Sequence, residues 1–282
     1  CKVYEILHLY KTVDLKKVTS VKKIGNGSSS FVYRITYEGT SYITKELYPQ
    51  GLQEQGILTR TSRGRIRLKR WPIGWIRWKQ AQFRFFRAIR TAYTLQSDPK
   101  TAQGVLHLSS VWIGNGSVYS ITDDCNGIPW DTVAEESPER ILQIGRIIAL
   151  HSHAIHQQNW LLVDIKASNF LVQQLPDEKI SVQLADFDSL VPLNRIFRQK
   201  QFRCSSETAP PEMIPPRPQD VGISSDVYCL AAMLFQKLGG QLEREQIRET
   251  FTRQIAVRLS DWSSQQCDAL LLIFLEALEL NP

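Results

Sequence analysis

Residues 161–172 read LLVDIKASNFLV, an apolar run that carries three strongly polar side chains. These are Asp164, Lys166 and Asn169, at spacings of two and three. A half-buried strand would alternate polar and apolar residues, and a core helix would carry no such groups. The run is better explained as two apolar strand ends that flank a short loop. We expect this loop to present its polar groups to a cleft.

The composition is that of an ordinary globular protein. The chain has 282 residues, 43% of them hydrophobic and 22% charged, with a net charge of +6. This length allows one large domain or two lobes. Five scattered cysteines without a C-x-x-C pair are typical of reduced thiols and favour a cytoplasmic location. No signal peptide is visible, and no apolar run reaches the length of about 18 residues that a membrane span needs.

Both ends of the sequence favour a segment of a longer protein. The chain opens on Cys1 without a methionine and closes on LELNP. We therefore expect the last part of the second lobe to be truncated at the C-terminus.

The first 50 residues predict a β-rich unit. They are rich in β-branched and aromatic residues and contain two turn-like stretches, at 25–30 and at Glu38-Gly39. We expect three antiparallel strands, near residues 20–25, 31–37 and 41–47. Two further strand-like segments meet at Asn115-Gly116, which is a strong hairpin signal.

From about residue 128 the sequence becomes mainly helical. Ser137, Pro138 and Glu139 form a helix-start signal, with a cap, a proline at the first position and an acid in the first turn. The stretch SSDVYCLAAMLFQKLGG predicts a second helix that ends on glycine. Two more helices are expected, near 241–254 and 261–279.

A glycine-rich turn lies between the first two predicted strands. It reads Gly25-x-Gly27-x-x-Ser30-x-Val32. Glycines let backbone N–H groups approach phosphate oxygens closely. The turn precedes a strand rather than a helix, which excludes a Rossmann dinucleotide site. By itself the pattern fits a simple hairpin equally well.

Two charged residues lie at positions that suit phosphate and metal chemistry. Lys45 is in the middle of the third predicted strand, at a distance from the glycine-rich turn that suits a cation reaching phosphates. A solvated strand face explains it equally well without that context. Asp186, in LADFDSL, follows an apolar strand, as a metal-binding carboxylate at a strand end would.

In their order and spacing, these segments resemble the protein kinase superfamily over nearly the whole chain. The matching segments are GNGSSSFV, Lys45, LVDIKASN, DFD, PPE at 210–212 and DVYCLAAMLF from Asp226. The resemblance implies an α+β, bilobal protein-kinase-like fold. Its parts would be a small antiparallel-β N-lobe with one main helix at 1–122, a hinge at 123–127 and a larger, mainly helical C-lobe at 128–282.

The resemblance also implies a transfer of the γ-phosphate of ATP, with Mg²⁺, to a hydroxyl group. Asp164 would accept the hydroxyl proton, and Lys166 would neutralise charge on the transferred phosphoryl group. Asn169 and Asp186 would hold Mg²⁺, and Asp226 would anchor the catalytic loop. The implied nucleotide-binding residues are Gly25, Gly27, Ser30, Val32 and Lys45, with Thr122, Asp123 and Cys125 at the hinge. Asp-x-Lys-x-x-Asn is closer to the serine/threonine pattern, which favours a protein substrate.

Three positions in these motifs depart from the family pattern. The His-Arg pair before the catalytic aspartate is Leu162-Val163, so activation by a phosphate on the activation loop is less expected. Ser30 replaces the third glycine of the phosphate loop. Asp188 replaces the glycine of DFG and adds a carboxylate near the metal site.

A fourth departure concerns the partner of Lys45. Aromatic and apolar residues recur at helical spacing between Trp75 and Tyr93 and predict an amphipathic helix at 75–96. By the resemblance this helix should carry a glutamate for Lys45, and it has no carboxylate. Either Glu54 is brought in by an insert, or another group holds Lys45, or the enzyme is weak. A pseudokinase-type binding module is therefore an alternative. A kinase for lipid or sugar hydroxyls is another, because bacterial lipopolysaccharide-sugar kinases show a similar Asp-x-Asp.

A basic and aromatic insert occupies 55–74 and continues into the helix at 75–96. Residues 55–97 contain no acid, and eleven Lys or Arg lie between Arg60 and Arg90. An amphipathic helix that packs on the sheet explains only the helical part. A basic stretch rich in tryptophan is what an anionic membrane surface attracts. We expect segment 60–79 to meet such a surface or an acidic glycan, and no nucleic-acid motif accompanies it.

Overall fold

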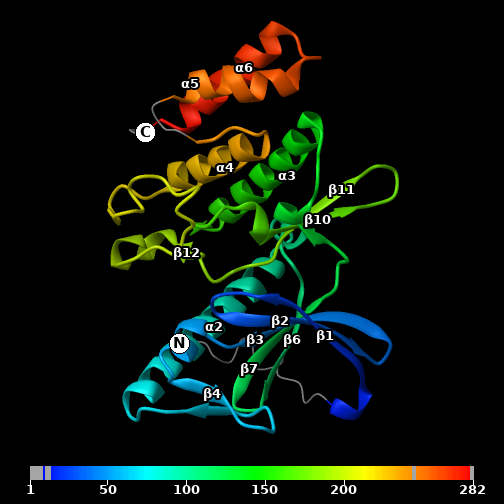
Figure 1. Cartoon of the computed structure of the whole chain (residues 1–282), viewed down its shortest axis with the longest axis vertical. Coiled ribbons are helices and arrows are strands. Elements are labelled where there is room, and N and C mark those ends of the chain that lie inside the picture. Colours follow the sequence, from blue (N-terminus) through cyan, green and yellow to red (C-terminus); the bar gives the residue numbers. More distant parts are fainter. Residues whose placement is uncertain (1–8, 10–13, 243–245, 280–282) are drawn as a thin grey trace. The chain divides into compact units, whose positions relative to one another are not determined.

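The computed structural model describes residue 9 and residues 14–242 and 246–279. The chain divides into two compact units, Cys1–Asn126 and Gly127–Pro282 (Figure 1). Antiparallel strands dominate the first unit and helices the second, which confirms the expected α+β fold class. Along the described residues, no helix is both long enough and apolar enough to cross a membrane.

The first unit is built on a five-stranded antiparallel sheet in the order β1-β2-β3-β7-β6. Its strands are β1 (Val18–Asn26), β2 (Ser30–Tyr37), β3 (Thr40–Leu47), β6 (Leu108–Gly114) and β7 (Ser117–Asp123). The three strands expected in the first 50 residues are confirmed, each slightly longer than predicted. A one-turn 3-10 helix, Leu15–Lys17, precedes β1.

Two tight turns set the register of this sheet. Glu38 and Gly39 join β2 to β3 with φ angles of 50° and 82°, and Asn115 and Gly116 join β6 to β7 with 54° and 77°. Positive φ at both central residues gives the turn the twist of the flanking strands. The hairpin predicted at Asn115-Gly116 is therefore confirmed.

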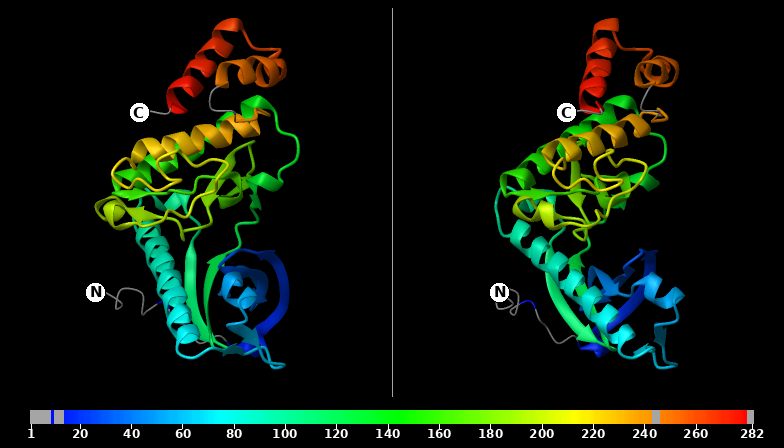
Figure 2. Two further views of the ribbon diagram at one scale, coloured as in Figure 1. Left: turned by 60° about the vertical axis from the view of Figure 1, so that its left-hand side comes forward. Right: turned by 90° about the vertical axis from the view of Figure 1, so that its left-hand side faces the viewer.

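Helix α2 (Ile73–Gln96) lies along one face of the sheet (Figure 2). Its buried side chains include Trp78, Phe85 and Ile89, which belong to one core cluster with Leu47 and Val111 of the sheet. Together with the buried Ala81, these helix residues are spaced three or four positions apart, so they form a single apolar stripe. The helix predicted at 75–96 is confirmed, with two more residues at its start.

The insert before α2 contains a small hairpin that the sequence did not predict. A short helix α1 (Gln50–Glu54) is followed by β4 (Leu58–Arg60) and β5 (Ile66–Leu68), which pair antiparallel. Strands of three residues are too short to show an alternating pattern, so the stretch looked aperiodic. A 3-10 turn, Ala102–Gly104, connects α2 to the rest of the sheet.

The second unit combines three longer helices with short β-ladders. The helices are α3 (Pro138–Gln157), α4 (Ile223–Lys237) and α6 (Ser264–Ala277). One ladder has the order β11-β10-β8, from Ile180–Leu184, Phe170–Gln174 and Ile128–Pro129, and β9 (Trp160–Leu161) pairs with β12 (Val191–Pro192). One-turn or two-turn 3-10 segments are Trp130–Thr132, Ala167–Asn169 and Leu193–Arg198. The Ser137 side chain caps α3 by accepting from the Arg140 N–H, as its start signal predicted.

The helix expected near 241–254 is confirmed in part, because the chain is helical from Ile247 onward but in segments of different type. Residues 243–245 lie outside the described part of the chain, and three different helical segments follow them. These are α5 (Ile247–Thr250), a π-helical turn (Phe251–Ile255) and a 3-10 turn (Ala256–Leu259). The buried residues Ile247, Phe251, Ile255 and Leu259 recur every four positions. Because an α-helix has about 3.6 residues per turn, such a repeat drifts around it, and the wider π-turn offsets part of this drift.

Candidate active site

The polar residues of 161–172 lie on a loop, as the sequence predicted. Strand β9 ends at Leu161, β10 begins at Phe170, and a 3-10 turn at Ala167–Asn169 joins them. Val163 has a φ of 70°, which is a strained conformation for a β-branched residue. Such strain persists only where surrounding contacts hold it, and it is often found at functional sites.

Asp164 is the centre of this loop. The Lys166 ammonium lies 2.7 Å from its Oδ2, and the Asn169 amide donates to the same oxygen at 3.2 Å and to the Asp164 carbonyl at 2.8 Å. The Ser205 N–H donates to Oδ1 at 2.8 Å. The Asp164 side chain is 10% exposed. Asp164 is therefore a fixed and accessible carboxylate, able to orient a hydroxyl group and accept its proton.

Asp226, near the start of α4, anchors the loop that carries Asp164. Its buried carboxylate accepts the backbone N–H groups of Leu162 and Val163, each at 2.8 Å, and His156 Nε2 lies 2.8 Å from Oδ2. The anchoring expected for Asp226 is confirmed. The contribution of His156 was not predicted, because its partner Asp226 lies 70 positions away in the sequence.

Asn169 and Asp186 are brought to the same end of one β-ladder. Phe170 opposes Leu184, and the Ala185 N–H donates to the Asn169 carbonyl at 2.9 Å. Asp186 is the next residue. The Asn169 amide nitrogen is engaged by Asp164, which leaves its side-chain oxygen for a cation.

A carboxylate and an amide oxygen are ligands that suit Mg²⁺, which keeps few protein ligands and takes the rest from phosphates and water. The residues present therefore fit the ion. In the described part of the chain, no group of three His, Cys, Asp or Glu side chains could hold a metal by itself. Asp188 adds a carboxylate two residues on, with Arg203 Nη1 at 4.0 Å.

Three of the residues predicted to bind the nucleotide, Gly25, Val32 and Lys45, lie in one row of the first unit's sheet. Gly25 on β1 opposes Val32 on β2, and Val32 opposes Lys45 on β3. Directly opposed side chains share a face, so Val32 and Lys45 point to the same side. The Gly27 N–H donates to the Ser30 carbonyl at 2.9 Å and closes the turn. The glycine-rich turn and Lys45 are thus neighbours through the ladder.

Of the predicted hinge residues, Thr122 and Asp123 are the last two residues of β7, and Cys125 follows the strand. Thr122 donates its hydroxyl to the Ile43 carbonyl at 3.2 Å, and Cys125 is half-buried. The Asp123 N–H donates to the His107 carbonyl at 3.1 Å, and its carboxylate lies 2.8 Å from His107 Nδ1. An adenine contact at this segment would therefore have to use backbone groups other than the Asp123 N–H.

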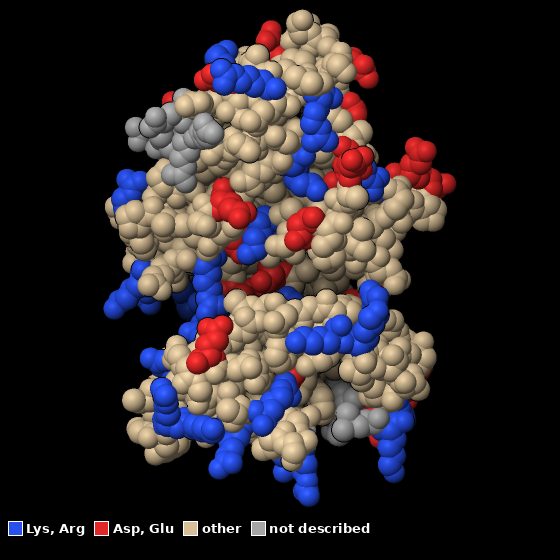
Figure 3. All heavy atoms as spheres, viewed as in Figure 1, with Lys and Arg blue, Asp and Glu red and all other residues tan. Residues whose placement is uncertain are grey.

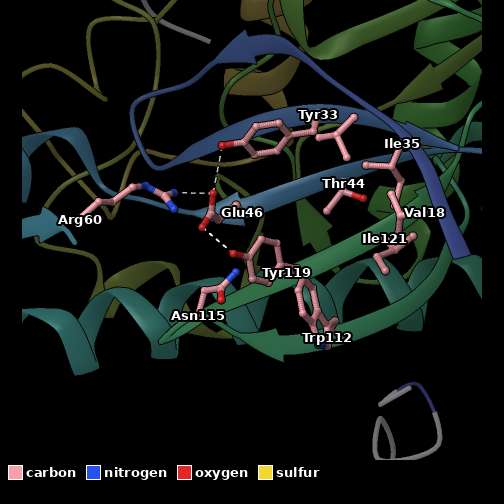
Figure 4. A pocket seen from close by; sticks show the side chains of 11 residues that line it. Val18, Tyr33, Ile35, Thr44, Glu46, Arg60, Trp112, Asn115, Tyr119 and Ile121 are labelled. Atoms are coloured by element: carbon pink, nitrogen blue, oxygen red, sulfur yellow. Dashed lines mark hydrogen bonds and ion pairs between the residues drawn. The ribbon is translucent and has the colours of Figure 1, made fainter. Parts of the chain in front are cut away.

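Glu46 is the carboxylate beside Lys45 in sequence, and it points to the opposite face of the sheet. It is 2% exposed and accepts from Arg60 Nη2 at 2.6 Å, from the Tyr119 hydroxyl at 2.7 Å and from the Tyr33 hydroxyl at 3.1 Å (Figure 4). The role of Glu46 was missed, because its partner Arg60 belongs to the unpredicted hairpin.

The other acid considered for Lys45 was Glu54. It is the last residue of α1, and its side chain is exposed. Lys45 itself is half-buried on β3.

A cavity of about 270 Å³ lies beside Glu46 (Figure 4). Apolar side chains of the sheet, including Ile35, Trp112 and Ile121, form much of its wall. The buried hydroxyl of Thr44 also lines it and has no hydrogen-bond partner among the described residues. The volume is below the range of about 300–1,000 Å³ that is usual for ligand pockets. Ordered water that satisfies Thr44 explains the cavity better than a ligand does.

The two tyrosines on Glu46 should ionise late in an alkaline titration. Burial, followed by the Glu46 carboxylate, raises the pKa of Tyr33 to about 12 and the pKa of Tyr119 further. Both folded pKa values exceed the unfolded value of about 10. Their contribution to stability is therefore complete below about pH 10 and is lost as the pH rises through the folded values.

Tyrosinate absorbance would measure this effect. We expect the Tyr33→Phe/Tyr119→Phe variant to lose the last part of the folded-state titration and to keep the rest. If the variant instead lost the part of the titration near pH 10, the raised pKa values would not belong to Tyr33 and Tyr119.

One comparison with known proteins covers much of the second unit. A family model described as protein kinase domain matches residues 95–270. This range includes the catalytic loop, Asp186 and α4, and it begins after the glycine-rich turn and Lys45. A search of the curated proteins found no match.

Proposed function

The chain belongs to the protein kinase superfamily, and from this premise we propose that it transfers the γ-phosphoryl group of ATP to serine or threonine hydroxyls of a protein. The proposal depends above all on Asp164. Its carboxylate is fixed by Asn169 and by the Ser205 N–H, with the Lys166 ammonium 2.7 Å away.

This arrangement supports a direct transfer to a hydroxyl. Asp164 would orient the hydroxyl and take its proton as the oxygen attacks the γ-phosphorus and the bond to the β-phosphate oxygen breaks. The Lys166 ammonium is placed to neutralise charge on the moving phosphoryl group. The lysine two residues after the aspartate favours a serine or threonine acceptor.

The remaining predicted residues would bind the nucleotide and its ion. Asn169 and Asp186 would hold Mg²⁺, which when bound neutralises charge on the phosphate oxygens. In the first unit, Lys45 and the turn at 25–30 would contact phosphates.

The experiment is a transfer assay with labelled ATP, Mg²⁺ and a degenerate peptide library. We expect label on serine or threonine, and a loss of at least about 100-fold in the Asp164→Asn variant, because an oriented base contributes about 10²–10⁴. Asp177→Asn is a matched control, because Asp177 is exposed in the turn between β10 and β11. It should retain full activity.

Three outcomes would contradict the proposal. Label found only on added lipid or sugar acceptors would overturn the protein substrate. Transfer to tyrosine would overturn the acceptor class. Nucleotide that raises the melting temperature without being consumed would favour a pseudokinase-type binding module.

A further inference from the structure

An exposed aromatic and aliphatic surface lies at the start of α2. Trp71 is 77% exposed and Phe83 is 72% exposed. We call the α2 surface the set of exposed large apolar residues Trp71, Ile73, Trp75, Ile76 and Phe83. Soluble proteins rarely leave such residues together in water unless the surface meets a partner.

Packing within the first unit does not account for these side chains. Trp78, Phe85 and Ile89 already form the buried stripe of α2 against the sheet. Trp75 and Phe83 lie outside that stripe and border a hollow of about 550 Å³ with Ile76, Lys79, Gln80 and Arg84. The helix therefore has a second apolar face that points away from the core.

Positive charge surrounds the α2 surface. Besides Arg60, which pairs with Glu46, the exposed basic residues of the β4–β5 hairpin and the start of α2 are Arg63, Arg65, Arg67, Lys69, Arg70, Arg77 and Lys79. The Trp71 and Trp75 rings lie 5.6 Å apart, and the Lys79 ammonium lies 5.9 Å from the Trp75 ring. Figure 3 shows Lys and Arg side chains projecting at the corner where Figure 1 places β4 and the start of α2. No acidic residue occurs from 55 to 97.

We propose that the α2 surface and the basic hairpin bind an anionic lipid bilayer. Tryptophan is favoured at the boundary between lipid headgroups and acyl chains, because its ring is apolar and its N–H is polar. Lysine and arginine beside such a surface contact lipid phosphates. A purely acidic partner would explain the charge and leave the exposed Trp71, Ile73 and Phe83 unexplained.

The test is co-sedimentation of the full chain with vesicles, without nucleotide, so that it does not depend on kinase activity. We expect strong binding to vesicles of phosphatidylcholine and phosphatidylglycerol and little binding to phosphatidylcholine alone. Each basic residue near an anionic surface is worth about a five-fold change in affinity. The Arg63→Gln/Arg65→Gln/Arg67→Gln/Lys69→Gln variant should therefore lose at least about 100-fold.

A second variant tests the apolar contribution. Ile73→Ser/Phe83→Ser should bind at least about 10-fold more weakly while it keeps the wild-type melting temperature, because both side chains are exposed. The matched control removes four exposed charges from the second unit, through Arg146→Gln, Lys179→Gln, Arg217→Gln and Arg248→Gln. It has the same net charge as the hairpin variant and should bind like the wild type.

Insertion of the tryptophan side chains into the bilayer can be measured separately, by fluorescence quenching. Acyl-brominated lipid should quench tryptophan fluorescence in the wild type and less in the Trp71→Phe/Trp75→Phe variant. Equal loss in the hairpin and control variants would overturn the proposal, as would binding to heparin without binding to vesicles. Binding unaffected by Ile73→Ser/Phe83→Ser would also overturn it.

Discussion

Replacing Asp226 with alanine should destabilise the second unit by about 3–5 kcal/mol and abolish phosphoryl transfer. The Asp226 side chain is fully buried and accepts the N–H groups of Leu162 and Val163, which are buried as well. Alanine leaves both donors without an acceptor, and each unpaired buried donor costs about 1–3 kcal/mol. Loss of the contact with His156 adds to this. The loop would then relax from the strained φ at Val163.

Chemical denaturation and hydrogen exchange would measure this effect. The free energy of unfolding should fall, and the amides of Leu162 and Val163 should exchange much faster than those of β10. Asp261→Asn is a suitable control, because Asp261 is exposed and should change stability by less than about 0.5 kcal/mol. A loss below about 1 kcal/mol in Asp226→Ala would show that the anchor matters little.

Replacing Glu46 with alanine should destabilise the first unit by about 3 kcal/mol or more. The change removes the shared acceptor of Arg60, Tyr33 and Tyr119. The Tyr119 side chain is buried and the Arg60 side chain is 29% exposed, so neither donor regains full hydration from water. Breaking a buried ion pair from one side is costly because the other charge stays behind.

A compensated variant separates this explanation from simple loss of volume. Glu46→Leu combined with Arg60→Leu, Tyr33→Phe and Tyr119→Phe removes every donor together with the acceptor. Because apolar replacement of a whole buried polar group can be nearly neutral, most of the lost stability should return. If the compensated variant is as unstable as Glu46→Ala, unpaired polar groups are not the cause. Thermal and urea unfolding would provide both values.

Local sequence signals were sufficient for much of the fold. Asn115-Gly116 predicted a hairpin, because a tight hairpin turn needs residues that tolerate positive φ. The apolar repeat from Trp78 to Ile89 predicted α2. The loop around Asp164 was recognisable because charged residues interrupted a buried run. In each case the information lay within a few residues of the feature.

Contacts between distant residues could not be predicted in this way. The Ser205 N–H meets Asp164 across 41 positions, and Arg60 meets Glu46 through a hairpin whose strands have three residues. The sequence predicted an ordinary helix near 241–254, and nothing in it signalled the π-turn at Phe251–Ile255. Pairings of this kind depend on the folded topology rather than on neighbours in the chain.

Asp226 holds the catalytic loop in a way that does not depend on the family's His-Arg pair. Asp226 binds the peptide amides of Leu162 and Val163, and these two hydrogen bonds do not need a particular side chain at either position. Val163 belongs to an apolar cluster with Val191, Ile196 and Met213, which all follow the DFD motif in the chain. Hydrophobic packing thus orders the activation segment where an arginine would have needed a phosphate as its counter-ion. Phosphatase treatment should leave the shape of this segment unchanged.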